Sequence, residues 1–202
     1  LFTSPHLIDF RERIMINNKM IDKELIIDFV KQHEKLFKII KPSFFEWCTA
    51  LAFHHFYQSK TDINIIETGL GGRLDSTNIL IPELSIITTI GLDHQSILGN
   101  SIEKIAVEKA GIIKNNIPTL LGPQVITTRN VFKQIAKKKR SIIIQAKKIN
   151  LNSDFTESQK YNYSTAISAV DLLNEKFPVK KSIINELKKQ PITIRGRWEI
   201  VE

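Results

Sequence analysis

The fold is decided by residues 63–78, which read INIIETGLGGRLDSTN. An apolar run ends in one acid, Glu67, and a turn rich in glycine follows it. Short apolar runs bounded by turn residues are typical of buried strands, and the ligands of open α/β sheets lie beyond the carboxyl ends of such strands. The pattern therefore predicts a functional role for Glu67, while a solvated acid in a loop fits the same residues.

A second apolar run, residues 84–94 (LSIITTIGLDH), also ends in glycine and polar groups. The sixteen residues from 68 to 83 are long enough for a parallel crossover, which needs about a dozen. If the two strands are parallel neighbours, Glu67 and His94 converge at one edge of the sheet. A carboxylate and an imidazole suit a divalent cation, whereas His94 taken alone fits an ordinary loop histidine.

A lysine interrupts the apolar face of the helix that we expect Ser101 to cap. The apolar positions of this helix, which should end near Lys114, are Ile102, Ile105, Ala106, Ala110 and Ile113. Lys109 falls within the same stripe on the helical wheel. A lysine that faces a core must pair with an acid, extend its amine to water or lose its charge. We therefore expect Lys109 either in an ion pair or, chemically altered, at the same polar cluster as Glu67.

Strand and helix patterns alternate along the remaining sequence, which predicts an α/β fold with a largely parallel sheet flanked by helices. Asn17-Asn18 indicates a hairpin turn, and Ser43 with Glu46 has the spacing of a helix capping box. Further predicted helices span residues 23–40, 125–138, 162–176 and 182–189, short strands span 118–121 and 142–144, and a polar loop spans 150–160. The helix over 23–40 should bury a broad face made of Leu25, Ile26, Phe29, Val30 and Leu36.

Composition limits the class of protein. The 202-residue chain has 29 Lys and Arg against 21 Asp and Glu. This excess attracts polyanions but is equally explained by a coding bias toward lysine, isoleucine and asparagine. The basic cluster Lys137–Arg140 has no interleaved aromatic residues, so no nucleic-acid partner is expected. One cysteine, Cys48, excludes an internal disulfide, and no apolar run approaches the roughly twenty residues of a membrane span. We therefore expect a cytoplasmic protein with no membrane partner.

Four segments resemble one known family in their order and spacing. They are Thr3–Leu7 (TSPHL), Glu67–Asn78 (ETGLGGRLDSTN), Gly91–His94 (GLDH) and Glu108–Ile112 (EKAGI). Together they resemble the folylpolyglutamate synthase/dihydrofolate synthase family of the Mur ligase superfamily, and the resemblance runs from Thr3 to Val201. The long second segment is much more specific than a lone glycine pattern.

The resemblance implies the fold of the central ATP-binding domain of a Mur ligase over residues 1–202, in incomplete form. No Gly-x-x-x-x-Gly-Lys-Ser/Thr phosphate loop occurs in the sequence, although the family has one upstream of its serine-proline-histidine motif. The family also has a C-terminal domain after its glycine-arginine segment, and a longer β-rich insertion where this chain has residues 150–160. We therefore expect a central fragment that does not catalyse ligation by itself.

The resemblance also implies an ATP and magnesium site. The metal ligands of the family match Ser4, Glu67, His94 and Lys109. The family's lysine is carbamylated by CO₂, so a carbamylated Lys109 would become an anionic ligand and a catalytic residue. Asn162 matches an adenine contact, and Arg197, the second catalytic residue, matches an arginine that faces the ATP phosphates. From the residues alone, Asn162 also fits a helix N-cap and Arg197 a solvated strand-edge arginine.

The implied reaction is ATP-dependent amide formation. The γ-phosphoryl group of ATP passes to a carboxylate of dihydropteroate or of a folate γ-glutamyl tail, and the amine of L-glutamate attacks the acyl phosphate. Magnesium neutralises charge on the phosphoryl group. Phe45 is expected to stack on the pterin, and Asp75 is expected to form a hydrogen bond with the pterin. Phe45 also fits a plain core position. All of these partners are small molecules, and a monomer is expected.

Two other functions stay open. A related Mur ligase that joins an amino acid to a UDP-muramyl peptide is the nearest enzyme, but the residues Gly-Leu-Gly-Gly-Arg-Leu-Asp at 69–75 favour the folate branch. A module that binds folate or nucleotide without catalysis is the alternative from another class.

Overall fold

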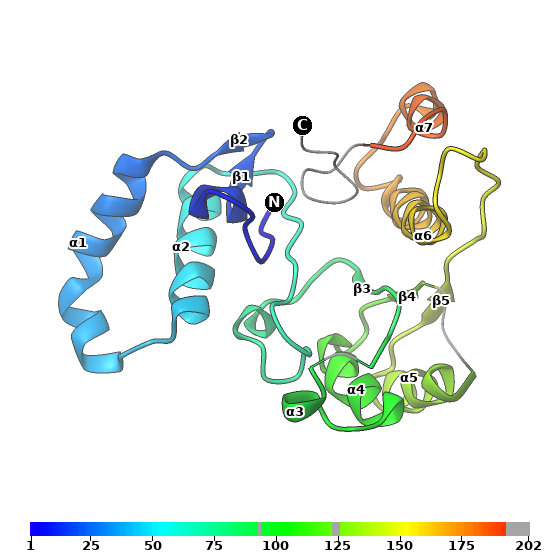
Figure 1. Cartoon of the computed structure of the whole chain (residues 1–202), viewed down its shortest axis with the longest axis horizontal. Coiled ribbons are helices and arrows are strands. Elements are labelled where there is room, and N and C mark those ends of the chain that lie inside the picture. The colour runs from blue at the N-terminus through cyan, green and yellow to red at the C-terminus, as the bar shows by residue number, and fades with distance from the viewer. Residues whose placement is uncertain (93, 123–125, 193–202) are drawn as a thin grey trace. The chain divides into compact units, whose positions relative to one another are not determined.

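A computed structural model of the chain describes residues 1–92, 94–122 and 126–192 (Figure 1). The chain divides into two compact units, Leu1–Leu80 and Ile81–Glu202. The expectation of one incomplete domain over residues 1–202 stays a prediction. Within the described ranges, no helix combines the length and the apolar character needed to cross a membrane.

The first unit consists of short local motifs and two long helices, coloured blue to cyan in Figure 1. In chain order it contains a 3-10 helix at Phe10–Arg13, strands β1 (Met15–Ile16) and β2 (Lys19–Met20), helices α1 (Lys23–Ile40) and α2 (Phe44–Gln58), and a 3-10 helix at Ser76–Ile79. β1 and β2 pair antiparallel. Asn17 and Asn18 connect them with φ of 51° and 62°. These left-handed values belong to a tight hairpin turn, so the predicted hairpin is confirmed.

Helices α1 and α2 begin where the sequence predicts. α1 has the predicted range, and Lys41 ends it in the left-handed conformation with φ of 52°. The backbone N–H of Ser43 donates to the Glu46 carboxylate over 2.7 Å, and Ser43 Oγ accepts from the Glu46 N–H over 3.3 Å. This reciprocal pair is the predicted capping box.

The core of the first unit forms between α1, α2 and the N-terminal segment. Its buried members are Phe2, Ile14, Ile21, Phe29, Cys48, Leu51, Ala52 and Phe56. The predicted broad face of α1 is wrong, because Leu25, Val30 and Leu36 are 44 %, 37 % and 47 % exposed. α1 instead packs through a narrower stripe of Ile26, Phe29 and Phe37.

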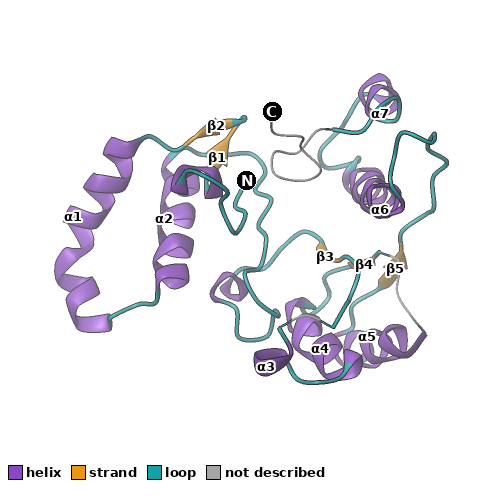
Figure 2. Cartoon of the chain, viewed as in Figure 1, coloured by secondary structure: helices purple, strands orange, loops and turns teal. Residues whose placement is uncertain are grey.

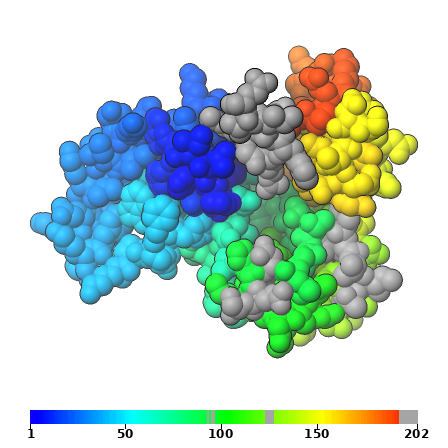
Figure 3. Space-filling model, viewed as in Figure 1, coloured from blue at the N-terminus to red at the C-terminus, as the bar shows by residue number. Residues whose placement is uncertain are grey.

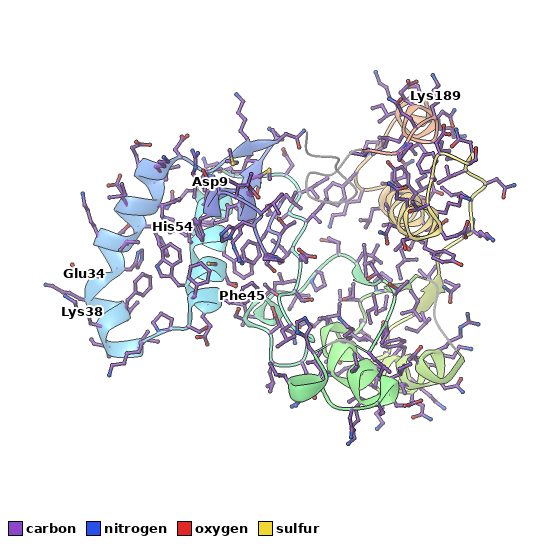
Figure 4. The ribbon with its side chains drawn as sticks, viewed as in Figure 1. Asp9, Glu34, Lys38, Phe45, His54 and Lys189 are labelled. Carbon is purple, nitrogen blue, oxygen red and sulfur yellow. The ribbon has the colours of Figure 1, made fainter. Side chains whose placement is uncertain are left out.

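One histidine of α2 is a packing residue, as its helical position suggests. His54 lies against Phe29 of α1, with ring centroids 5.2 Å apart, and Figure 4 shows it between the two helices. The neighbouring His55 also lies on α2, and partial burial lowers the pKa of its imidazole.

The apolar run before Glu67 is extended, but it is not the buried strand that the sequence predicts. Its backbone forms a parallel bridge between Ile66 and Phe2. Ile66 is half-buried, whereas Ile63 and Ile65 are 52 % and 66 % exposed. Within this unit the run pairs with one short segment rather than with a sheet, and its alternate side chains therefore stay in contact with solvent.

The second unit has the predicted parallel α/β architecture. Its elements are β3 (Ser85–Ile87), α3 (Gln95–Leu98), α4 (Ile102–Lys109), a 3-10 helix at Ala110–Ile112, β4 (Thr119–Leu121), α5 (Ile126–Lys139), β5 (Ile143–Gln145), α6 (Glu157–Leu173) and α7 (Lys181–Leu187). The strands form a sheet of order β3-β4-β5. Both pairs are parallel, with Ser85 opposite Thr119 and Thr119 opposite Ile143.

Helices cover both faces of this sheet (Figure 2). α4 and α5 pack on one face over a buried cluster of Ile87, Ala106, Ala110, Ile113, Leu121, Phe132 and Ala136. α6 lies on the opposite face and contacts β4. Ser168 and Ser164 of α6 accept hydrogen bonds from the backbone N–H groups of Lys147 and Ile149, over 2.9 and 3.2 Å, in the segment that follows β5.

The start of α6 differs from the prediction. Thr156 caps the helix, because its Oγ1 accepts from the Gln159 N–H over 3.2 Å while the Gln159 side chain accepts from the Thr156 N–H over 2.8 Å. Residues 157–160 are therefore helical rather than part of a loop. The hydroxyl of Tyr163 in α6 also accepts a hydrogen bond from the Ile192 N–H over 2.7 Å. Figure 3 shows the atoms of α6 (yellow) next to those of α7 (orange to red).

Candidate functional site

The N-terminal segment brings residue 4 beside residue 67. Phe2, which is fully buried, bridges Ile14 on one side and Ile66 on the other. Its N–H donates to the Ile65 carbonyl over 2.8 Å, and its carbonyl accepts from the Glu67 N–H over 2.9 Å. Ser4 and Glu67 lie next to each other where these paired segments end.

Ser4 and Glu67 are in direct contact. The Ser4 N–H donates to Glu67 Oε2 over 2.8 Å, although the residues lie 63 positions apart. Ser4 is half-buried and Glu67 is exposed. Two of the four predicted metal ligands thus lie together, with a carboxylate held in place by a backbone donor.

Glu12 fixes the loop that follows Ser4, a role that the sequence interpretation missed. Its carboxylate accepts from the N–H groups of Leu7, Ile8 and Asp9 over 2.7, 3.2 and 2.9 Å. These backbone hydrogen bonds stabilise the carboxylate anion and lower the pKa of Glu12, and the bond from Asp9 has the largest effect. Asp9 and Glu12 have capping-box spacing, so the signal for this anchor was present in the sequence.

A second missed residue, Arg13, holds the same loop from its base. The Thr3 N–H donates to the Arg13 carbonyl over 3.0 Å. The buried Arg13 side chain then donates from Nε to His6 Nδ1 over 2.8 Å. Its guanidinium carbon lies 5.4 Å from the ring centroid of Phe44, within cation–π range. No local pattern signals this contact, because it depends on the direction of a long side chain.

Asp75 organises the glycine-rich turn. Its Oδ2 accepts from the N–H groups of Gly69 and Leu70, each over 2.9 Å. Its Oδ1 accepts from Thr77, from the N–H over 2.9 Å and from Oγ1 over 2.5 Å. A carboxylate has about four acceptor positions, and these four bonds occupy them. Its predicted contact with a substrate stays a prediction.

Phe45 lies under the same turn. The ring is half-buried and packs on Phe2, with centroids 5.8 Å apart. A Cβ placed on Gly69 would lie 2.5 Å from the tip of the Phe45 ring, so this position requires glycine for the close approach. Figure 4 shows Phe45 at the start of α2. Phe45 therefore supports the turn beside Glu67, and its stacking on a pterin stays a prediction.

The other two predicted ligands lie in the second unit. His94 is exposed, with φ of 52°, directly before α3. Ser101 caps α4 as expected, its Oγ accepting from the Lys104 N–H over 3.3 Å. Lys109 is the last residue of α4 and is half-buried, beside the fully buried Ala110. The convergence of His94 and Lys109 on Glu67 stays a prediction.

The end of α4 corrects one boundary. The helix stops at Lys109 and not near Lys114, because the backbone tightens into the 3-10 turn at Ala110–Ile112. The predicted apolar stripe nevertheless holds, since Ile105, Ala106, Ala110 and Ile113 are buried.

The two predicted nucleotide contacts, Asn162 and Arg197, both stay predictions. Asn162 is exposed in the second turn of α6. It is not an N-cap, because Thr156 has that role. Its predicted contact with adenine stays a prediction. Arg197 lies outside the described residues.

The donors of Ser4 and Glu67 fit a magnesium ion. Mg²⁺ binds through one or two carboxylates and other oxygens, and keeps several waters. In the described part of the chain the Glu67 carboxylate takes one hydrogen bond, through Oε2. Oε1 and the Ser4 hydroxyl are therefore available as hard oxygen donors. No three described His, Cys, Asp or Glu side chains form a metal-binding group by themselves, and the predicted set contains only two such side chains.

Comparison with known proteins finds folylpolyglutamate and dihydrofolate synthases among the relatives of the chain. The chain is 34% identical over 222 residues to a dihydrofolate synthase/folylpolyglutamate synthase of Buchnera aphidicola subsp. Acyrthosiphon pisum, an alignment that covers 100% of the chain and 52% of the relative. A crystal structure of folylpolyglutamate synthase from Thermotoga maritima matches with a TM-score of 0.84 and 31% identity, covering 100% of the chain and 53% of the relative. Escherichia coli FolC in complex with DHPP and ADP matches with a TM-score of 0.84 and 26% identity, covering 100% and 52%. The chain thus spans about half the length of these relatives, and no protein-family model matches it.

Proposed function

Because the chain belongs to the folylpolyglutamate synthase/dihydrofolate synthase family, we propose that it is part of an ATP-dependent carboxylate–amine ligase. The reaction transfers the γ-phosphoryl group of ATP to a carboxylate of dihydropteroate or of a folate γ-glutamyl tail. The amine of L-glutamate then attacks the acyl phosphate and releases phosphate. The relative from Escherichia coli was solved with DHPP and ADP, and a folylpolyglutamate synthase was solved with AMPPCP and folate, which supports a nucleotide and a folate-type substrate.

The contact between Ser4 and Glu67 carries this proposal. Phosphoryl transfer needs little covalent chemistry from a protein, and much positioning and charge neutralisation. The Ser4 N–H fixes Oε2 of the Glu67 carboxylate, and Oε1 takes no hydrogen bond from the described residues. A fixed carboxylate beside a hydroxyl is a donor set suited to Mg²⁺ and the phosphates that it carries.

Each remaining residue has a role in the proposed mechanism. Magnesium, when bound, supplies neutralising charge for the phosphoryl group. Ser4, Glu67 and His94 would hold it. Lys109 joins them only as a carbamate, because an ammonium group has no lone pair for a cation. Lys109 is half-buried at the end of α4. This position suits an anionic carbamate whose charge is balanced by a metal ion.

The nucleotide and the substrate contact other residues. Arg197 faces the phosphates of ATP, and Asn162 contacts the adenine. Phe45 stacks on the pterin. Asp75 is the hydrogen-bonding partner of the pterin, and two of its four hydrogen bonds hold the Gly69 and Leu70 backbone beside it. A cytoplasmic location belongs to the same proposal.

Titration calorimetry of ADP in the presence of Mg²⁺ tests the proposal on the chain itself. We expect binding that weakens about tenfold or more in Glu67→Gln, because one ligand loses its charge while keeping its shape. Glu34→Gln is the matched control, since Glu34 pairs with Lys38 on the outside of α1 over 2.7 Å (Figure 4). Equal affinity in the wild type and in Glu67→Gln would contradict the proposal.

A substrate panel separates the branches of the superfamily. Labelled L-glutamate is supplied with ATP to a longer protein that contains this chain, with dihydropteroate, folate or a UDP-muramyl peptide as acceptor. We expect incorporation with the pteridine acceptors. Incorporation with the UDP-muramyl peptide alone would place the chain in another branch, and nucleotide binding without incorporation would favour a non-catalytic module.

A further inference from the structure

One flank of α1 carries apolar side chains that the first unit leaves exposed. The helix packs into the core of this unit through Phe29 and Phe37, yet Leu25, Leu36 and Ile39 are 44 %, 47 % and 79 % exposed. At 3.6 residues per turn these three side chains lie together, to one side of the stripe that is packed. The exposed apolar residues of α1 therefore form a surface of their own and are not scattered around the helix.

Two opposite charges lie on the same flank. Within the described part of the chain, no ion pair involves Asp28 or Lys35, whereas Glu34 and Lys38 pair over 2.7 Å on the outside of α1 (Figure 4). We call the whole flank the α1 stripe, and its members are Leu25, Asp28, Gln32, Lys35, Leu36 and Ile39. The α1 stripe thus has an acid in its first half and a base in its second half.

The first half of the α1 stripe borders a cavity between α1 and α2. The cavity has a volume of about 100 Å³, and its lining includes Leu25 and Asp28 from α1 and Leu51 and His55 from α2. An apolar cavity of about 150 Å³ holds a benzene molecule, so this one has room for a single aliphatic side chain. The second half of the α1 stripe presents such a side chain, Ile39. One half of the stripe therefore has the hollow that the other half can fill.

We propose that the α1 stripe is an interface between two copies of this chain, whose α1 helices pair antiparallel about a twofold axis near Gln32. Leu25 and Ile39 are each seven residues from Gln32, so Ile39 of the second copy lies level with Leu25 and its cavity. Asp28 then lies within one residue of the level of Lys35 of the second copy, about 1.5 Å along the helix axis. The apolar contact and the ion pair thus agree on one register. The inference is independent of the proposed function, because none of these residues belongs to the candidate site.

The order of the charges selects the antiparallel direction and a second copy as the occupant. A parallel pair would place Asp28 beside Asp28 and Lys35 beside Lys35, and like charges repel. In a twofold interface the same surface serves both copies, so each contact forms twice. The 18 residues of α1 make a helix about 27 Å long, and one pair of such helices buries less than the roughly 1,200 Å² of a stable interface. We therefore expect a weak dimer whose population depends on concentration.

Sedimentation equilibrium of the chain at low salt tests the interface. We expect the wild type to dimerise reversibly. Asp28→Lys and Lys35→Asp should each weaken the dimer about tenfold or more, because either change turns two attractive pairs into two repulsive ones. The double variant exchanges the two charges and should recover the affinity of the wild type. Glu34→Lys is the matched control, because it makes the same change of charge on the same helix outside the α1 stripe.

Single cysteines test the register. The twofold axis brings residue 32 beside its own copy, so Gln32→Cys should form a disulfide-linked dimer under mild oxidation, which needs Cα atoms within about 7 Å. Leu25→Cys alone should not, because its two copies lie about 21 Å apart along the helix axis. Leu25→Cys combined with Ile39→Cys should restore the link. The native Cys48 is buried and should not cross-link.

Several results would overturn the interface. A chain that sediments as a monomer at every concentration has no such dimer, and this result also decides the expectation of a monomer. A dimer that Glu34→Lys weakens as much as Asp28→Lys, or that the exchange of charges does not restore, forms through another surface. Cross-linking of Leu25→Cys alone would show a parallel pair. If the chain dimerises but a longer protein that contains it stays monomeric, a segment of that protein covers the α1 stripe in place of a second copy.

Discussion

Replacing Gly69 by alanine should destabilise the first unit through one contact. The added Cβ would lie 2.5, 2.7 and 2.8 Å from three atoms of the Phe45 ring, whereas carbon atoms prefer separations of about 3.5–4.0 Å. Gly69 has no positive φ among the described backbone angles, so steric crowding is the whole effect. The ring must move by about 1 Å, and its packing on Phe2 opposes that movement.

We expect Gly69→Ala to cost about 2 kcal/mol, within the range of about 1–3 for overpacking a core. The expected cost lies near the middle of this range because the Phe45 ring is half-buried and can move partly out of the way. In a Phe45→Leu background the tip of the ring is absent, so the same alanine should cost less than about 0.5 kcal/mol. The coupling between the two sites should therefore be about 1.5 kcal/mol, a typical value for residues in contact.

Urea unfolding measures these costs. Trp47 on α2 reports on the first unit, and Trp198→Phe removes the other tryptophan of the chain. With a slope of about 2 kcal/mol per M, the midpoint should fall by about 1 M in Gly69→Ala. Gly91→Ala is the control, because its Cβ would meet nothing within 4 Å. An equal cost for Gly69→Ala in both Phe45 backgrounds, or no greater cost than for Gly91→Ala, would show that the Phe45 ring does not restrict residue 69.

Three further predictions concern single side chains. The pKa of Glu12 is lowered below its ordinary value of 4.5 by backbone hydrogen bonds, so its stabilisation is present above pH 4.5 and is lost as pH falls through the lower folded-state pKa. Glu12→Gln should therefore have a lower free energy of unfolding than the wild type in urea titrations at neutral pH, and this difference in free energy should narrow in acid. A difference that does not change with pH would contradict the role of Glu12 as an anchor of the loop. Burial raises the pKa of the Cys48 thiol to about 11, so at pH 8 about one thiol in a thousand is ionised. Alkylation of Cys48, followed by mass spectrometry, should therefore be slow until urea unfolds the chain. Rapid alkylation of the native chain would contradict this prediction. Lys109→Ala should weaken Mg²⁺ binding in calorimetry, with partial recovery in acetate, because a small carboxylate replaces the anionic carbamate; unchanged binding would exclude Lys109 from the site.

Much of the fold could be predicted because its signals are local. Ser43 with Glu46, and Ser101 with Lys104, satisfy donors within a single helical turn. The Asn17-Asn18 hairpin likewise needs only residues that adopt positive φ. Thr156 and Gln159 have the same capping spacing, and polar composition obscured this start of α6.

The remainder depends on which distant segments meet. The side chains of Ile63 and Ile65 are apolar, but their burial depends on the neighbours of the run and not on the run itself. The contact of Ser4 with Glu67 spans 63 positions, and only the family resemblance linked the two residues beforehand. The pairing of Arg13 with His6 required the direction of a side chain, which no spacing encodes.

Manganese broadening of backbone amide signals shows whether Ser4, Glu67, His94 and Lys109 bind the same metal ion. Mn²⁺ replaces Mg²⁺ at oxygen sites and broadens the signals of nearby residues, wherever they lie in the sequence. We expect the signals around Ser4, Glu67, His94 and Lys109 to broaden together at one metal concentration in the presence of ADP, and we expect Glu67→Gln to abolish the effect. Broadening confined to one of the two units, or unchanged in Glu67→Gln, would contradict a shared metal site.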